Sequence, residues 1–275
     1  MSGLPWALYR KQVLAVLRLE LRKNFLSRRG WWIWLLAGFP AFICVMHGLL
    51  SRSTGHDLGE DTKIFAGIFQ LAYLRFAIYF GCVGIFMNLV RGDVLEKTLH
   101  YYFLAPVRRE VVMIGKYLAG LAVAAFLFGG STLVSFYFIR YHYGSEFQQW
   151  MWNGPGLGHM GWYLVTAALA CLGYGAVFLL MGLLVRNPMI PAAVVMVWEG
   201  INNFLPAFLQ QISVIYYLKS LTPVNVVEEG PLAMLAVTAD PAPAWLAITG
   251  VVLVSGLLVL YAAVRSRRFE ISYAE

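Results

Sequence analysis

Residues 31–50 read WWIWLLAGFPAFICVMHGLL, and this stretch decides the class of protein. It contains no Asp, Glu, Lys or Arg. A helix of this length rises by about 30 Å, which matches the thickness of the hydrocarbon core of a bilayer. Because lipid offers no hydrogen-bonding partner to the backbone, such a segment crosses the membrane as a helix. The stretch therefore predicts an all-α integral membrane protein.

Further apolar stretches follow along the chain of 275 residues, which is 60% hydrophobic and 13% charged. An average soluble domain has about 25% charged residues. The charges here gather between the apolar stretches, as expected for one transmembrane domain over 1–275. We expect six transmembrane helices, at 31–50, 64–90, 117–138, 161–185, 190–209 and 244–264.

The basic residues predict the orientation of these helices. An even number of spans places both termini on one side, and sixteen of the 21 Lys and Arg residues fall in the segments on that side. Four lie in the segments on the other side. The positive-inside rule then predicts that both termini and the loop 91–116 are cytoplasmic. This distribution of basic residues accounts for the net charge of +7, so we expect no nucleic acid as a partner.

The segment 1–30, which precedes the first span, is predicted to contain an amphipathic helix at the membrane interface. Leu14, Leu17 and Leu21 recur at helical spacing and would face the lipid. The alternative is an ordinary helix that packs on a partner. The basic face of the interfacial helix is formed by Lys11, Arg18, Arg22 and Arg29.

The segment 205–243 lies between the fifth and sixth predicted spans on the extracytoplasmic side. It contains five prolines, and its apolar part is interrupted by Gln210, Gln211 and Lys219. These polar residues make a further full span unfavourable. We expect a re-entrant or surface-lying helical segment here, because irregular backbone within a membrane needs protein or water around it.

The sequence contains no pattern typical of an enzyme. HExxH and GxSxG motifs are absent, and Gly115-Lys116 lacks the flanking residues of a phosphate-binding loop. The three cysteines lie inside apolar stretches, where they are expected to be buried small residues. We therefore predict no catalytic residue, no metal ligand and no cofactor bound by this chain.

Two ionisable residues lie within predicted spans, Arg75 in the second and Glu199 in the fifth. A charge at this depth costs a few kcal/mol and usually faces protein, water or an opposite charge. Their similar depth suggests a pair. Such a pair would be either a structural ion pair or part of a pathway or gate, with proton coupling as a third alternative. The polar residues assigned to this site are Arg75, Glu199, Asn202 and Asn203.

Small residues in two predicted spans indicate close helix packing. Glycine lets helices approach each other in a membrane because it has no side chain at the contact. The residues concerned are Gly81, Gly84, Gly173, Gly175 and Gly182.

Residues 96–120, EKTLHYYFLAPVRREVVMIGKYLAG, are too polar for a span and too apolar for a solvated loop. The segment resembles the cytoplasmic loop between spans two and three of type 2 ABC-transporter permeases. Glu96, Thr98-Leu99 and Gly115-Lys116 match the ends of that motif. Ala105-Pro106-Val107 and Arg109 match its centre, whereas Lys97 replaces the usual glycine.

The resemblance implies a coupling helix that docks on a separate ATPase subunit. Its apolar and aromatic residues are typical of a protein interface. Arg108, Arg109 and Lys116 would surround it, near lipid phosphates or acidic groups of the partner. The alternative is a loop lying in the headgroup layer. The docking residues would be Glu96, Thr98, Leu99, Tyr101, Tyr102, Phe103, Leu104, Pro106, Arg108 and Arg109.

The resemblance further implies the permease subunit of an exporter in a bacterial-type inner membrane. Two ATPase subunits would carry ATP and Mg²⁺, and a second permease copy or a paralogue would complete the path. Two alternatives remain. An ion-coupled secondary transporter would need chemistry within the spans, for which Glu199 is the best carboxylate. A membrane enzyme or scaffold would need clustered reactive groups.

Overall fold

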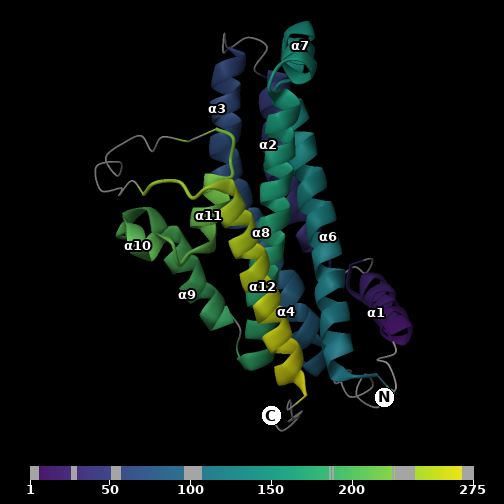
Figure 1. Ribbon diagram of the computed structural model, residues 1–275. Helices are drawn as coiled ribbons and strands as arrows, with labels where there is room; N and C mark the ends of the chain where they lie inside the picture. The colour runs from purple at the N-terminus through teal and green to yellow at the C-terminus, as the bar shows by residue number, and fades with distance from the viewer. Residues whose placement is uncertain are drawn as a thin grey trace.

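The structure, a computed structural model, describes residues 6–25, 30–50, 57–95, 107–185, 187, 189–224, 226 and 239–267. Within these ranges the chain is helical and contains no strand. Figure 1 shows the long helices side by side in one bundle. Helices that are long and apolar enough to cross a membrane run over Trp31–Leu50, Leu58–Val94, Arg109–Tyr143, Gly156–Leu184 and Ala244–Ser266. The protein is therefore all-helical and membrane-embedded.

Most of these helices extend beyond the apolar stretches that predicted them. The helix α2 (Trp31–Leu50) has the expected bounds, and α12 (Ala244–Ser266) nearly so. However, α8 (Gly156–Leu184) and α6 (Arg109–Phe138) begin before residues 161 and 117, where the predicted spans began. In α6 the extra turns contain Arg109, Glu110 and Lys116, whose charges have partners in the fold. Charged turns are thus part of the same helix.

The second span is a helical run in three parts. It begins with α3 (Leu58–Ile68), where the Asp57 side chain accepts a hydrogen bond from the backbone N–H of Glu60 at 2.6 Å. This is the usual way to satisfy a free donor at a helix start. The middle part, η4 (Phe69–Ala77), is π-helical and contains Arg75, and α4 (Ile78–Leu95) follows. The run starts six residues before the predicted residue 64.

The fifth predicted span is not a continuous helix. The helix α9 (Met189–Gly200) has 12 residues, which is about 18 Å and too short for the hydrocarbon core. The chain continues through η6 (Asn202–Phe204), α10 (Ala207–Gln210) and α11 (Val214–Ser220). In Figure 1, α9 rises beside the bundle, and α10 and α11 bend back towards α12. The prediction of one helix over 190–209 is therefore wrong.

The two ends of the bundle differ. At one end, α1 (Trp6–Glu20) lies across the bundle beside the first turns of α6, and η1 (Leu21–Phe25) follows it (Figure 1). The last turn of α12 lies at this same end, which we call the α1 end. At the opposite end, called the α7 end, η5 (Tyr141–Tyr143) and α7 (Ser145–Asn153) connect α6 to α8.

Close helix contacts form at the predicted small residues. A Cβ atom added to Gly84 of α4 would meet the Trp32 ring of α2 at 1.8 Å. A Cβ atom added to Gly182 of α8 would lie 3.2 Å from the backbone of Met87. The expectation of tight packing at these glycines is confirmed. The cysteines Cys44, Cys82 and Cys171 are all buried, also as expected.

Candidate functional site

The N-terminal helix packs on α6 through a face other than the one that carries Leu14. Leu14, expected on the apolar face, is 48% exposed, whereas Val16 and Glu20 are buried. A Cβ atom added to Gly115 of α6 would lie 2.9 Å from the Cβ atom of Val16. Gly115 therefore permits the close approach of α1. The exposure of Leu14 is compatible with the predicted lipid-facing side, whereas the contact of α1 with α6 was not predicted, because it includes a carboxylate that binds to a residue of α6.

That carboxylate belongs to a buried charge cluster, formed by Glu20, Lys23, Asp93 and Lys116. The Lys116 ammonium donates to Glu20 and, at 2.5 Å, to Oδ2 of Asp93. Lys23 donates to Oδ1 of Asp93 at 2.6 Å. Lys116 is 1% exposed and Glu20 is fully buried. Such charges are tolerated at this depth because each has an opposite charge in contact.

The charge cluster contains Asp93, which comes just before the segment 96–106 in the sequence. Asp93 precedes this segment near the end of α4, and its carboxylate is held by η1 and α6. Glu20, Lys23 and Asp93 were not singled out from the sequence. Glu20 offered a signal, because it is the one acidic residue among seven Lys and Arg in residues 1–30, whereas Asp93 shares residues 91–116 with Glu96 and Glu110.

The residues that follow the segment 96–106, Arg108 to Glu110, also have partners in the fold. The Arg108 guanidinium lies 5.5 Å from the ring centroid of Tyr9 in α1. The Nη1 atom of Arg109 donates to the carbonyl of Arg267 at 3.1 Å, and Glu110 accepts from Nε of Arg267. The start of α6 is thus tied both to α1 and to the end of α12.

The residues predicted for the docking segment and for the basic face of the N-terminal helix divide into those that the structure describes and those that it does not. Arg108 and Arg109 have the intramolecular partners just given, and Lys116 is buried in the charge cluster instead of facing lipid or a partner. The basic residues Lys11, Arg18 and Arg22 of the N-terminal helix are exposed as expected. The remaining predicted residues lie outside the described part of the chain: Arg29, Glu96, Thr98, Leu99, Tyr101, Tyr102, Phe103, Leu104 and Pro106.

A second buried site lies where α9 ends. The Glu199 carboxylate accepts hydrogen bonds from the backbone N–H groups of Val214 and Ile215, at 3.1 and 2.9 Å. It also accepts from the hydroxyl groups of Ser213 and Tyr174, at 2.8 and 3.3 Å. Glu199 thus caps the first turn of α11, where free N–H groups favour a negative charge. We call this arrangement the Glu199 elbow.

Arg75 does not pair with Glu199, contrary to expectation. Its Nη1 atom donates to the backbone carbonyl of Gly200 at 3.4 Å, and between these two described residues there is no ion pair. The ion pair does not form because the Glu199 oxygens are already taken by donors from α11 and α8. Arg75 and Glu199 lie near each other, as their similar predicted depth in the membrane implied, but each binds a different partner.

The two asparagines of the predicted site also have defined partners. Asn202 is buried and donates from Nδ2 to the carbonyl of Gln210 at 3.2 Å. Asn203 accepts from the Lys219 ammonium at 2.7 Å. These two contacts connect η6, which follows α9, with α10 and α11. The four residues predicted as a pathway or gate therefore all lie at the elbow, where they hold irregular backbone.

Within the described ranges, no group of three or more His, Cys, Asp or Glu residues is arranged to hold a metal ion. Comparison with models of protein families finds no family that matches this chain. A search of the curated proteins likewise finds no matching relative. The assignment of function therefore depends on the geometry of the chain itself.

Proposed function

We propose that this chain is the permease subunit of an ATP-driven ABC exporter, working as a dimer with two separate ATPase subunits. The observation that carries the proposal is the anchoring of both flanks of residues 96–106. One flank is held by the charge cluster, and the other by Arg108 on Tyr9 and by Glu110 on Arg267. A docking segment needs such supports, because a loose loop would absorb the motion of its partner.

The proposed coupling follows from what the supports connect. A displacement of residues 96–106 acts on α4 through Asp93 and on α6 through Lys116, and both residues are linked to the N-terminal segment. In turn, α4 packs closely on α8 at the centre of the bundle. ATP-driven movement of a docked ATPase would thus reach several membrane helices together. Rigid, packed elements of this kind carry mechanical coupling between distant sites.

The substrate path would form between two permease copies. Arg75 and Asn203 are partly exposed at the elbow and are our candidates for groups that face this path. Glu199 and Asn202 are buried and hydrogen-bonded, so we assign them to the support of the path. This arrangement favours ATP-driven transport over ion-coupled transport, because the Glu199 carboxylate is already occupied by four donors.

Co-purification tests the docking role directly. The tagged chain, extracted in mild detergent from its native membrane, should bring down an ATPase whose activity vanadate inhibits. The double variant Tyr102→Asp with Phe103→Asp should lose this ATPase while remaining inserted, because charges in an apolar contact prevent docking. The matched control is Tyr141→Asp with Trp152→Asp, which changes two exposed aromatic residues at the α7 end. Unchanged association in the Tyr102 and Phe103 variant would refute the docking role.

A further inference from the structure

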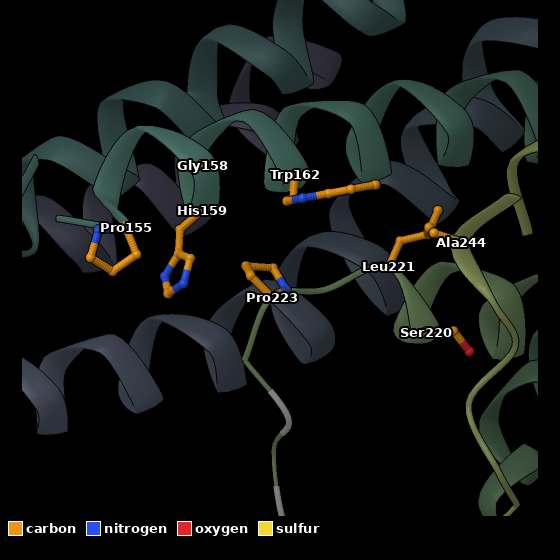
Figure 2. Close-up of a pocket in the computed structure, with 8 residues that line it drawn as sticks. All are labelled: Pro155, Gly158, His159, Trp162, Ser220, Leu221, Pro223 and Ala244. Atoms are coloured by element: carbon orange, nitrogen blue, oxygen red, sulfur yellow. The ribbon is translucent and has the colours of Figure 1, made fainter. Parts of the chain in front are cut away.

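A pocket of about 440 Å³ lies at the α7 end, on the side of the bundle where α8, α11 and α12 meet. Its size falls within the range of small-molecule sites. One wall is a single face of α8, since Gly158, His159 and Trp162 follow one another at helical spacing (Figure 2). The remaining lining residues are Pro155, Ser220, Leu221, Pro223 and Ala244.

The pocket is apolar on most sides. Figure 2 shows the His159 ring between Pro155 and Pro223, and the Trp162 indole extended towards Leu221 and Ala244. Trp162 is 39% exposed although it lies among packed helices. The Ser220 hydroxyl contributes little, because it already donates to the Tyr216 carbonyl and accepts from the Ala242 N–H. An occupant must therefore present mainly apolar surface.

Two polar side chains of the pocket have no hydrogen-bond partner in the described chain. The His159 ring makes no hydrogen bond there, and its Nδ1 atom is buried. Trp162 is the more exposed of the two, and its indole N–H has no acceptor among the described residues. Because Nδ1 is buried, Nε2 is the ring nitrogen of His159 that a ligand in the pocket can meet, and a ligand acceptor could bind there and at the indole N–H. Both groups can donate, which favours an acceptor on the ligand.

The charge behind the pocket favours an acidic acceptor. Among the lining residues that the structure describes there is no Asp, Glu, Lys or Arg. The buried Arg140 guanidinium lies 5.2 Å from the Trp150 ring, and this ring lies 5.6 Å from the ring of His159. The nearby carboxylate of Asp61 is held by His47 at 3.0 Å and faces His142 at 3.6 Å. A cationic ligand group would gain nothing at such a site.

We propose that this pocket binds an anionic amphiphile, with its acidic group at His159 and Trp162 and its apolar body against Leu221 and the two prolines. This inference goes beyond the proposed transport function and does not depend on an ATPase. The acidic group could belong to a free carboxylic acid or to an anionic lipid, which share the same chemistry at the site.

Photo-crosslinking of the full chain tests the proposal. The chain is placed in phosphatidylcholine nanodiscs with decanoic acid that carries a diazirine, or in a second arm with a diazirine phosphatidylglycerol. We expect labelled peptides to concentrate on residues 155–162 and 220–223, with competition by excess unlabelled decanoate. Labelling in one arm only would identify the source as free acid or lipid. Labelling spread evenly over the exposed faces of α2 and α12 in both arms would overturn the proposal.

Variants make the test specific. His159→Leu should lower labelling by the acid roughly tenfold, which corresponds to a lost hydrogen bond to a charged group. Labelling by the matching diazirine decanol should fall less, because it carries no charge. Trp162→Ala should weaken both probes, whereas Trp245→Ala, which removes a 68% exposed indole next to Ala244, should change neither. If Trp162→Ala folds poorly, equal labelling of His159→Leu and the native chain would still refute the site.

Discussion

The charge cluster and the Glu199 elbow stabilise buried carboxylates in different ways. Both bury a carboxylate, yet Glu20 and Asp93 are neutralised by lysines, whereas Glu199 is surrounded by neutral donors at a helix start. The cluster joins three separate parts of the chain through charges. The elbow orders one short stretch of irregular backbone. The difference suggests that the cluster ties helices together, while the elbow shapes a single segment.

The largest effect is expected from Lys116→Met. It leaves the buried Glu20 carboxylate without its lysine and should destabilise the protein by about 3–5 kcal/mol, as for other broken buried pairs. The measurement is the midpoint of heat-induced loss of monodisperse protein in detergent. Adding Glu20→Met should restore much of the stability, since an apolar pair avoids the uncompensated charge. Exposed Lys11→Met is the control, and an equal loss there would contradict the role of the cluster.

Glu199→Gln should have a smaller effect, about 1–3 kcal/mol. The amide keeps one acceptor but turns an NH₂ group towards donors from α11 and Tyr174. Limited proteolysis near Ser213 should become faster in step with the loss of thermal stability. Glu146→Gln, at an exposed position in α7, serves as control. A loss as large as that of Lys116→Met would mean that the elbow depends on charge as strongly as the cluster does.

Gly115→Val tests whether close packing supports the cluster. The new side chain would overlap Val16 and push α1 from α6, at a cost of about 1–3 kcal/mol. Gly130→Val in the same helix is a matched control, because a Cβ atom at Gly130 meets nothing within 4 Å. Both variants place a β-branched residue in α6, so the difference in their unfolding midpoints isolates the contact. Equal midpoints would show that α1 does not need this approach.

The smallest effect is expected from Arg75→Gln, below about 1 kcal/mol, because its hydrogen bond to Gly200 is long and partly exposed. The exchange Arg75→Glu with Glu199→Arg should not recover the folded yield that Glu199→Arg alone loses. An arginine at 199 cannot accept from the N–H groups of α11. Recovery of folded protein in the exchange variant would demonstrate a direct pair after all.

Much of the fold followed from patterns within single segments. The bounds of α2 and α12 and the close contacts at glycines were predictable because length and side-chain size are local properties. The break after Gly200 was signalled by Pro206 but placed too late. The helix ends earlier because Glu199 turns to cap α11, and this contact involves residues that follow only after the break.

The candidate site was less predictable than the fold. Gly115-Lys116 was recognised in the sequence as the end of a loop motif. The sequence did not show that Gly115 makes room for α1 or that Lys116 pairs with Glu20 of α1. Arg75, Glu199, Asn202 and Asn203 lie near one another, but the expected ion pair between Arg75 and Glu199 does not form. A charged residue in an apolar stretch indicates that the fold must supply a partner, but the sequence does not identify which residue that partner is.

The sequence by itself determined a helical membrane protein with a basic N-terminal segment and a distinctive loop after its second span. Those properties depend on composition and on spacing within a segment. Only the tertiary structure decided that Glu20, Asp93 and Lys116 meet, and that Glu199 serves α11 instead of Arg75. Such partners come from distant parts of the chain. They are selected by helix packing, since a buried charge accepts whichever compensating group the fold places against it.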